Sequence, residues 1–210
     1  DAVYAVRKRG ELMEEAVPAG VGTMAAVLGM ESQELEQITD QVTAEGNSVQ
    51  LANLNCPGQI VISGTVKGVS LASQLAKEKG AKRVIPLDVS GPFHSALMEP
   101  AAKKFSAVLE SLDIKDATVP VISNVTASPI TDANEIKAKL VEQLYSPVLW
   151  ENSVEKLVEL GVDTFIEIGP GKVLSGLVKK VNRKLTTYSI SDEESLVSTI
   201  EVIKGEIQNA

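Results

Sequence analysis

Residues 22–63 read GTMAAVLGMESQELEQITDQVTAEGNSVQLANLNCPGQIVIS. Three short apolar runs in this stretch are typical of buried strands, at 22–28, 49–54 and 59–63. Between the first two runs, Leu35, Ile38 and Val42 recur at the spacing of one helix face, and Ser32 is a suitable N-cap. Asn55-Cys56-Pro57-Gly58 has the composition of a turn. The stretch therefore predicts a strand, a helix and a two-stranded hairpin in succession.

The next residues complete a recognisable unit. Residues 69–79 have the apolar spacing of a second amphipathic helix, and Gly80 is placed to end it as the C′ residue. A final strand is expected over 83–89. The resulting order βαββαβ is that of a ferredoxin-like module over residues 21–89, an order that predicts a fold and no function.

Beyond residue 90 the pattern changes to an alternation of helices and strands. Helices are expected at 96–112, 133–144, 154–160, 172–182 and 193–207, and strands at 119–125, 164–168 and 186–190. Such alternation predicts a parallel sheet with helices on both faces. We therefore expect an α/β protein in which the module at 21–89 is inserted into a larger α/β domain formed by residues 1–20 and 90–210.

Composition excludes several classes of function. The 210 residues are 44% hydrophobic, enough for a packed core, and no apolar run approaches the roughly 18 residues that a membrane span needs. A net charge of −8 and few aromatic residues argue against nucleic-acid binding. The single cysteine, Cys56, forms no internal disulfide and fits the cytoplasm. One histidine and one cysteine cannot supply the usual zinc ligands, so we expect no metal.

The only histidine of the chain lies in Gly91-Pro92-Phe93-His94-Ser95-Ala96-Leu97-Met98. Gly91 and Pro92 interrupt the preceding apolar run, which predicts that His94 lies on a loop between a strand and a helix. Scaffolds often present reactive side chains on such loops, and an imidazole exchanges protons near neutrality. By spacing alone, a hydrogen-bonded structural histidine is the alternative.

Five motifs occur in a fixed order along the chain: Arg7-Lys8-Arg9-Gly10-Glu11-Leu12-Met13, Asn53-Leu54-Asn55-Cys56-Pro57-Gly58-Gln59, the His94 motif, Gln143-Leu144-Tyr145-Ser146-Pro147-Val148 and Glu167-Ile168-Gly169-Pro170-Gly171-Lys172-Val173-Leu174. Together they resemble the malonyl-CoA:acyl-carrier-protein transacylases of fatty-acid synthesis. The resemblance extends from residue 1 to about residue 190. It implies an α/β-hydrolase-like large subdomain, present here in part, with an inserted ferredoxin-like small subdomain.

The resemblance also implies a mechanism. The family uses a serine nucleophile in Gly-His-Ser-x-Gly and a histidine base. His94 matches that base, and Gln143 matches the residue that orients it, chiefly through its main-chain carbonyl. Malonyl-CoA and the phosphopantetheine thiol of acyl carrier protein would be the two substrates, with no further cofactor.

Other matched positions concern the substrate. Arg9 matches the arginine that binds the malonyl carboxylate, for which a guanidinium offers a planar fork. Phe93 matches a bulky residue that restricts room for an α-methyl branch. Asn55 and Gln59 match positions that face the acyl and pantetheine path, although a turn-forming role for Asn55 is equally open.

The sequence departs from the family at the nucleophile, since residues 1–210 contain no Gly-x-Ser-x-Gly. The chain also begins without Met and within an apparent helix. We therefore expect a C-terminal piece of a longer polypeptide, with the nucleophile upstream and the fragment alone inactive.

Two alternatives remain at this stage. One is an acyltransferase domain of a polyketide synthase, and the other is a non-catalytic ferredoxin-like binding module in which His94 is structural. For the transacylase we expect a cytoplasmic monomer. Because the carrier protein of the family is acidic, docking would require a local basic patch, for which Lys179, Lys180, Arg183 and Lys184 are the main candidates.

Overall fold

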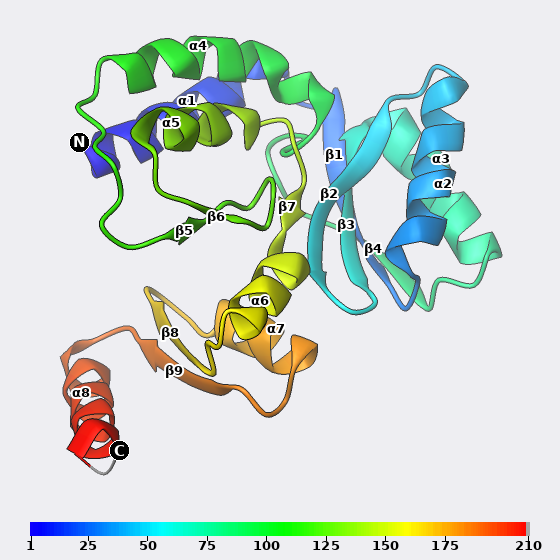
Figure 1. Ribbon diagram of the computed structural model, residues 1–210. Coiled ribbons are helices and arrows are strands. Elements are labelled where there is room, and N and C mark those ends of the chain that lie inside the picture. Colours follow the sequence, from blue (N-terminus) through cyan, green and yellow to red (C-terminus); the bar gives the residue numbers. More distant parts are fainter. Residues whose placement is uncertain (209–210) are drawn as a thin grey trace. The chain divides into compact units, whose positions relative to one another are not determined.

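The computed structural model describes the backbone of residues 1–208 and the side chains of residues 1–205 (Figure 1). The chain divides into two compact units, Asp1–Ser153 and the part that starts at Val154, and each is described by itself. The helices are α1 (Ala2–Ala16), α2 (Ser32–Ala44), α3 (Val66–Glu78), the short 3-10 helix η1 (Ala96–Met98), α4 (Glu99–Glu110), α5 (Ala133–Glu142), α6 (Trp150–Glu159), α7 (Val173–Val181) and α8 (Glu193–Gln208). The strands are β1 (Gly22–Leu28), β2 (Val49–Cys56), β3 (Gln59–Thr65), β4 (Arg83–Pro86), β5 (Val121–Ile122), β6 (Pro129–Ile130), β7 (Val148–Leu149), β8 (Thr164–Ile168) and β9 (Thr186–Ile190).

The first unit is built on a five-stranded sheet of order β4-β1-β3-β2-β7. Strand β1 pairs antiparallel with β3 and with β4, and β2 pairs antiparallel with β3. The predicted order βαββαβ is thus observed from β1 to β4, and Gly80 follows the last residue of the helix cap with a φ of 103°. Helix α2 begins at Ser32 itself, one residue earlier than an N-cap role for Ser32 would require, and Glu31 is the N-cap.

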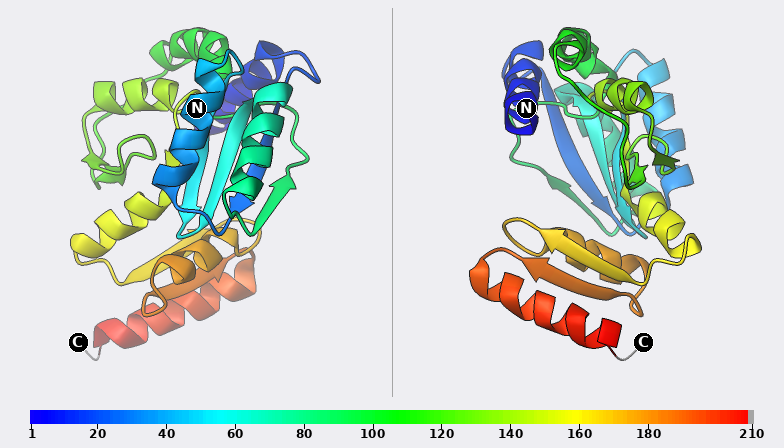
Figure 2. Two further views of the ribbon diagram at one scale, coloured as in Figure 1. Left: turned by 90° about the vertical axis from the view of Figure 1, so that its right-hand side faces the viewer. Right: turned by 60° about the vertical axis from the view of Figure 1, so that its left-hand side comes forward.

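Helices α2 and α3 cover one face of this sheet (Figure 2). Leu35, Ile38 and Val42 of α2 are completely buried, as their helical spacing predicts. They belong to one apolar cluster with alternate residues of the strands, such as Val27 and Ile62. The strand residues between them point to the opposite face, where Met24, Ala52 and Val61 form a smaller cluster.

The sheet extends beyond the residues from which it was predicted. Strand β7 joins it in parallel beside β2, with Asn53 opposite Val148 and Leu54 opposite Leu149. A strand of two residues is too short to produce a detectable alternation of apolar and polar residues. The edge strand β4 is also shorter than predicted: it ends at Pro86, although the Leu87 N–H still donates to the Met24 carbonyl at 3.0 Å.

The predicted large parallel sheet is only partly observed among the described residues. The expected strand at 119–125 is reduced to β5, which pairs antiparallel with β6. In the second unit β8 and β9 do run parallel, and α7 connects them. The expected helix at 96–112 divides into η1 and α4, with Pro100 in the first turn of α4.

A second core of the first unit lies between α1, η1 and α4. Met13 of α1 packs in one cluster with Met98, Phe105 and Leu109. Helix α5 also contacts α4, so these helices group together beside the sheet (Figure 1). This packing fixes the position of α1, whose other residues contribute to the candidate site.

In the second unit, the turn Gly169-Pro170-Gly171 leads from β8 to α7, and both glycines have positive φ values, of 145° and 95°. The Glu167 carboxylate accepts hydrogen bonds from the N–H groups of Leu174 and Ser175, at 3.1 and 2.7 Å. These bonds hold the pKa of Glu167 below its usual value. The Glu167 carboxylate thus pairs with N–H groups at the start of α7. This pairing supports a structural role for Gly169-Pro170-Gly171 as a tight turn. Over the described residues, no helix has both the length and the apolar character to cross a bilayer.

Candidate active site

The loop between β4 and η1, residues 87–95, is called the His94 loop and is held in an unusual backbone conformation. His94 has a φ of 57°, in the left-handed region that few residues other than glycine adopt. The buried Ser95 hydroxyl donates to the Pro92 carbonyl at 2.7 Å, and the Met98 N–H donates to the Ser95 carbonyl at 2.8 Å. Two local hydrogen bonds therefore close the loop around His94.

The imidazole of His94 contacts a carbonyl from a distant segment. Its Nδ1 lies 2.9 Å from the main-chain oxygen of Gln143, at the end of α5. Because a carbonyl only accepts, Nδ1 must carry the proton and the lone pair of the neutral ring lies on Nε2. The Gln143 side chain is directed elsewhere, since its Nε2 donates to the Ser146 carbonyl at 3.3 Å. The contact through the main chain is the one that the resemblance implies.

Three influences act on the pKa of His94. Burial is the largest and lowers it, the hydrogen bond with the Gln143 carbonyl raises it, and the positive charge of Arg9 lowers it. The net result is a pKa below the ordinary 6.5. At neutral pH the ring is therefore uncharged, the state in which it can accept a proton.

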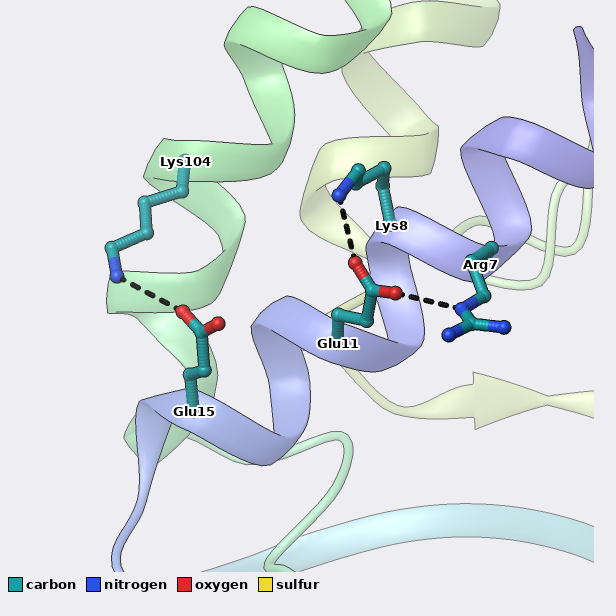
Figure 3. Close-up of polar contacts among 5 residues, drawn as sticks. All are labelled: Arg7, Lys8, Glu11, Glu15 and Lys104. Atoms are coloured by element: carbon teal, nitrogen blue, oxygen red, sulfur yellow. Dashed lines mark hydrogen bonds and ion pairs between the residues drawn. The ribbon is translucent and has the colours of Figure 1, made fainter.

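The basic run at the start of the chain is divided between two environments. On the outer face of α1, Glu11 binds both Arg7 and Lys8, at 2.7 and 2.8 Å (Figure 3). Glu15 makes a looser pair with Lys104 of α4, at 3.6 Å. These pairs account for the cations on the exposed side of the helix.

Arg9 is different, because it is half-buried and burial lowers the pKa of its guanidinium. Among residues 1–205, Arg9 forms no ion pair within 4.0 Å. A desolvated cation without a carboxylate partner is suited to bind an anion. The structure thus distinguishes Arg9 from Arg7, as the resemblance does.

Arg9 and His94 line one cavity of about 530 Å³, together with Phe93. The other lining residues are Gly10, Met13, Glu14, Met24, Asn53, Leu87, Val89 and Ser90. Gly10 lies in the middle of α1, and a β-carbon there would meet no atom within 4 Å. Three of the residues singled out from the sequence therefore share one cavity between α1, the sheet and the His94 loop.

The other two predicted substrate residues do not line this cavity. Asn55 is the second-last residue of β2 and Gln59 begins β3, so both lie at the hairpin. Gln59 accepts a long hydrogen bond from the Cys56 thiol, with Sγ and Oε1 3.8 Å apart. The turn itself consists of Pro57 and Gly58 alone, so the prediction of a turn over residues 55–58 is too long and Asn55 is a strand residue.

Two residues that the sequence reading missed belong to the site. Asn53 lines the cavity, and the signal for it was a polar residue within the predicted strand at 49–54. Gln50 binds the main chain of the His94 loop and of the segment after α5. Its partners are all backbone groups far away in the sequence, so no spacing rule could identify them.

The fold and the site together define an α/β protein in which a half-buried histidine and a half-buried arginine without an ion pair among residues 1–205 line one cavity. The sequence profile described as "Acyl transferase domain" matches residues 1–203. The chain belongs to the acyl transferase domain family.

Several curated proteins are similar to this chain over its whole length. The chain is 68% identical over 210 residues to the malonyl CoA-acyl carrier protein transacylase of Bacillus subtilis (strain 168), covering all of this chain and 66% of that protein. It is 48% identical over 209 residues to the protein of the same name from Staphylococcus aureus (strain MRSA252), again covering 66% of its length. The chain thus spans about two thirds of the length of the curated relatives that it matches.

Solved structures of malonyl-transacylases are similar to this chain as well. The malonyl CoA-acyl carrier protein transacylase from Clostridium perfringens superimposes with a TM-score of 0.92 at 42% identity, over 97% of this chain and 64% of that one. A malonyl-transacylase solved in complex with a type II PKS acyl-carrier protein gives a TM-score of 0.91 at 42% identity, over 95% of this chain and 64% of that one. These likenesses extend the family assignment to the three-dimensional structure.

Proposed function

We propose that this chain carries the base and the carboxylate anchor of an enzyme that transfers malonyl from malonyl-CoA to the phosphopantetheine thiol of acyl carrier protein. The observation that carries the proposal is the shared cavity of Arg9 and His94, with the proton of His94 held on Nδ1 by Gln143. Arg9 supplies a cation for the free carboxylate of the malonyl group. The unprotonated Nε2 of His94 is the base.

The first half-reaction follows from these roles. A serine hydroxyl attacks the thioester carbonyl while Nε2 of His94 takes its proton. The bond between serine Oγ and the malonyl carbon forms, the bond to the CoA sulfur breaks, and the imidazolium returns the proton to the thiolate. In the second half-reaction the carrier thiol gives its proton to His94 and attacks the malonyl ester, and the serine oxygen leaves with that proton. The serine lies outside residues 1–210 in this proposal, on an upstream segment of the parent protein.

The parts of the fold have corresponding roles in the proposal. Residues 21–89 form the ferredoxin-like small subdomain, and residues 1–20 and 90–210 contribute to an α/β-hydrolase-like large subdomain. The cavity lies where α1 and the His94 loop meet the sheet. Phe93 provides an apolar wall that disfavours an α-methyl branch by about 1–3 kcal/mol. Asn55 and Gln59, at the β2–β3 hairpin, would contact the pantetheine arm further from the reacting carbon.

The carrier protein is the proposed partner, and the solved complex of a related malonyl-transacylase with a carrier protein supports this assignment. The candidate docking patch is the cluster formed by Lys179, Lys180, Arg183 and Lys184. In the structure the Lys179 amine donates to the Leu185 carbonyl, so this lysine also secures the end of α7. Arg183 and Lys184, which are both exposed, are therefore the better positions for charge reversal, which should slow transfer to the carrier and leave formation of the malonyl-enzyme unchanged.

The test is transfer of labelled malonyl by the full-length protein that contains this chain. His94→Ala should abolish transfer. Retained activity would instead favour the alternative that the protein is a non-catalytic binding module in which His94 is structural. Preference for a free acyl carrier protein over a polyketide-synthase carrier domain would separate the two acyltransferase alternatives. The proposal requires no cofactor beyond the two substrates and places the enzyme in the cytoplasm as a monomer.

A further inference from the structure

The side chain of Gln50 connects three segments that are distant in the sequence. Gln50 lies in β2 between Val49 and Leu51, which belong to the core under α2 and α3. Because side chains alternate along a strand, Gln50 projects to the opposite face of the sheet. This is the face next to which the His94 loop lies, as the clustering of Phe93 with Met24 and Ala52 shows.

The amide of Gln50 makes three hydrogen bonds there. Its Nε2 donates to the carbonyl of His94 and to the carbonyl of Tyr145, both at 3.3 Å. Its Oε1 accepts from the N–H of Ala96 at 3.0 Å. Only one orientation of the amide satisfies all three partners, since two are acceptors and one is a donor.

These partners bracket the two groups whose contact fixes the imidazole. The bonds to the His94 carbonyl and the Ala96 N–H hold the loop on both sides of Ser95, directly after His94, whose backbone is left-handed. The bond to Tyr145 holds the segment two residues after Gln143, whose carbonyl meets His94 Nδ1 at 2.9 Å. One side chain therefore sets the separation between the base and the carbonyl that orients it.

We propose that Gln50 is a positioning residue, which keeps His94 in the Nδ1–H tautomer by holding the His94 loop and the Gln143–Tyr145 segment at a fixed distance. The inference rests on the proposed function where it concerns rate, because only then does the tautomer matter for catalysis. Its structural part does not depend on that function. Without Gln50 the imidazole would lose its fixed carbonyl partner and take up the Nε2–H tautomer in part, in which the nitrogen needed as base is already protonated.

The main test uses Gln50→Met in the full-length protein, since methionine keeps the length of the side chain and removes its donor and acceptor. The ring ¹⁵N shifts of His94 at pH 8, identified by their absence in His94→Gln, report which nitrogen is protonated. Wild type should show a protonated Nδ1 alone, and Gln50→Met a mixture of tautomers. Its kcat for malonyl transfer should fall about tenfold to hundredfold, with little change in KM, as expected for a misplaced catalytic group.

Two further variants make the test decisive. Gln37→Met, at an exposed position on α2, should leave both the tautomer and kcat unchanged. Gln50→Glu keeps the acceptor for the Ala96 N–H while losing the donor to the two carbonyls, and it carries the test if Gln50→Met does not fold by circular dichroism. A wild-type tautomer in a folded Gln50 variant would overturn the proposal, even if kcat fell. The tautomer readout decides the role of Gln50 whether or not the protein transfers malonyl.

Discussion

The two faces of the sheet formed by β1 to β4 differ in what they bury. The face under α2 and α3 is a closed apolar core, in which Leu35, Ile38 and Ile62 have no exposed surface. The opposite face carries the small cluster of Met24, Ala52 and Val61, with polar side chains and a cavity beside it. The same strands therefore contribute to the apolar core on one face and to the candidate site on the other. Substitutions on the two faces should separate stability from activity.

The largest effect is expected at the base. His94→Ala in the full-length protein should lower kcat for malonyl transfer by about 10²- to 10⁴-fold, the usual contribution of a general acid–base group. The midpoint of urea unfolding should change little, because the half-buried ring makes one hydrogen bond to a carbonyl. Steady-state kinetics and equilibrium unfolding measure the two quantities. A large loss of stability with modest loss of rate would place His94 with the structural residues.

The opposite face should respond in the reverse way. Leu35→Ala removes a completely buried side chain from the α2/α3 core and should destabilise the protein by about 2–5 kcal/mol. The kcat of the folded protein, measured well below its unfolding midpoint, should remain close to wild type. A matching loss of kcat would show that the two faces are coupled, and would break the comparison.

Arg9 and Arg7 sharpen the comparison within a single helix. Arg9→Ala should cost about 1.5–3 kcal/mol in kcat/KM for malonyl transfer, because the substrate carboxylate loses a charge-assisted partner. Acetyl transfer has no carboxylate to lose and should change little or improve. The matched control is Arg7→Ala, which removes an exposed side chain paired with Glu11 and should affect neither substrate. Equal losses for malonyl and acetyl would assign Arg9 to the fold.

The pH dependence should report the environment of His94. Since the neutral ring is the base and its pKa is lowered by burial, kcat/KM should rise with pH to a plateau, with a midpoint below 6.5. The free energy of unfolding should also rise with pH. Between the lowered pKa of the folded protein and 6.5, the unfolded state binds more protons than the folded state, so the protein loses stability as the pH falls through this window. His94→Gln should remove that part of the dependence. A kinetic midpoint above 6.5 would contradict the burial argument.

The smallest effect is expected at Gly10, which lies inside α1 and faces the cavity. Gly10→Ala should stabilise the helix by about 0.5–1 kcal/mol, because alanine loses less backbone entropy on folding. Its methyl group would occupy cavity space and should raise KM for malonyl-CoA a few-fold. Gly176→Ala is the control, since Gly176 also has open space in a helix and does not line the cavity. An unchanged KM in Gly10→Ala would show that substrate does not reach this wall.

The sequence determined the elements from β1 to β4 and the loop position of His94, because apolar periodicity and the Gly-Pro break are local properties. Through the resemblance it also singled out Arg9, which lines the cavity, and the main-chain carbonyl of Gln143, which contacts His94. The helix and strand ends were less well predicted, as with β4, since they depend on which backbone groups find a partner in the sheet.

Only the tertiary structure decided which groups meet. It separated Arg9 in the cavity from Arg7 in its pair with Glu11, added β7 beside β2, and brought Asn53 and Gln50 to the site. The partners of Gln50 are two backbone carbonyls, which every residue possesses, and one N–H, which every residue except proline possesses. Such groups leave no mark in a sequence, and their pairing is fixed only when packing brings distant segments together.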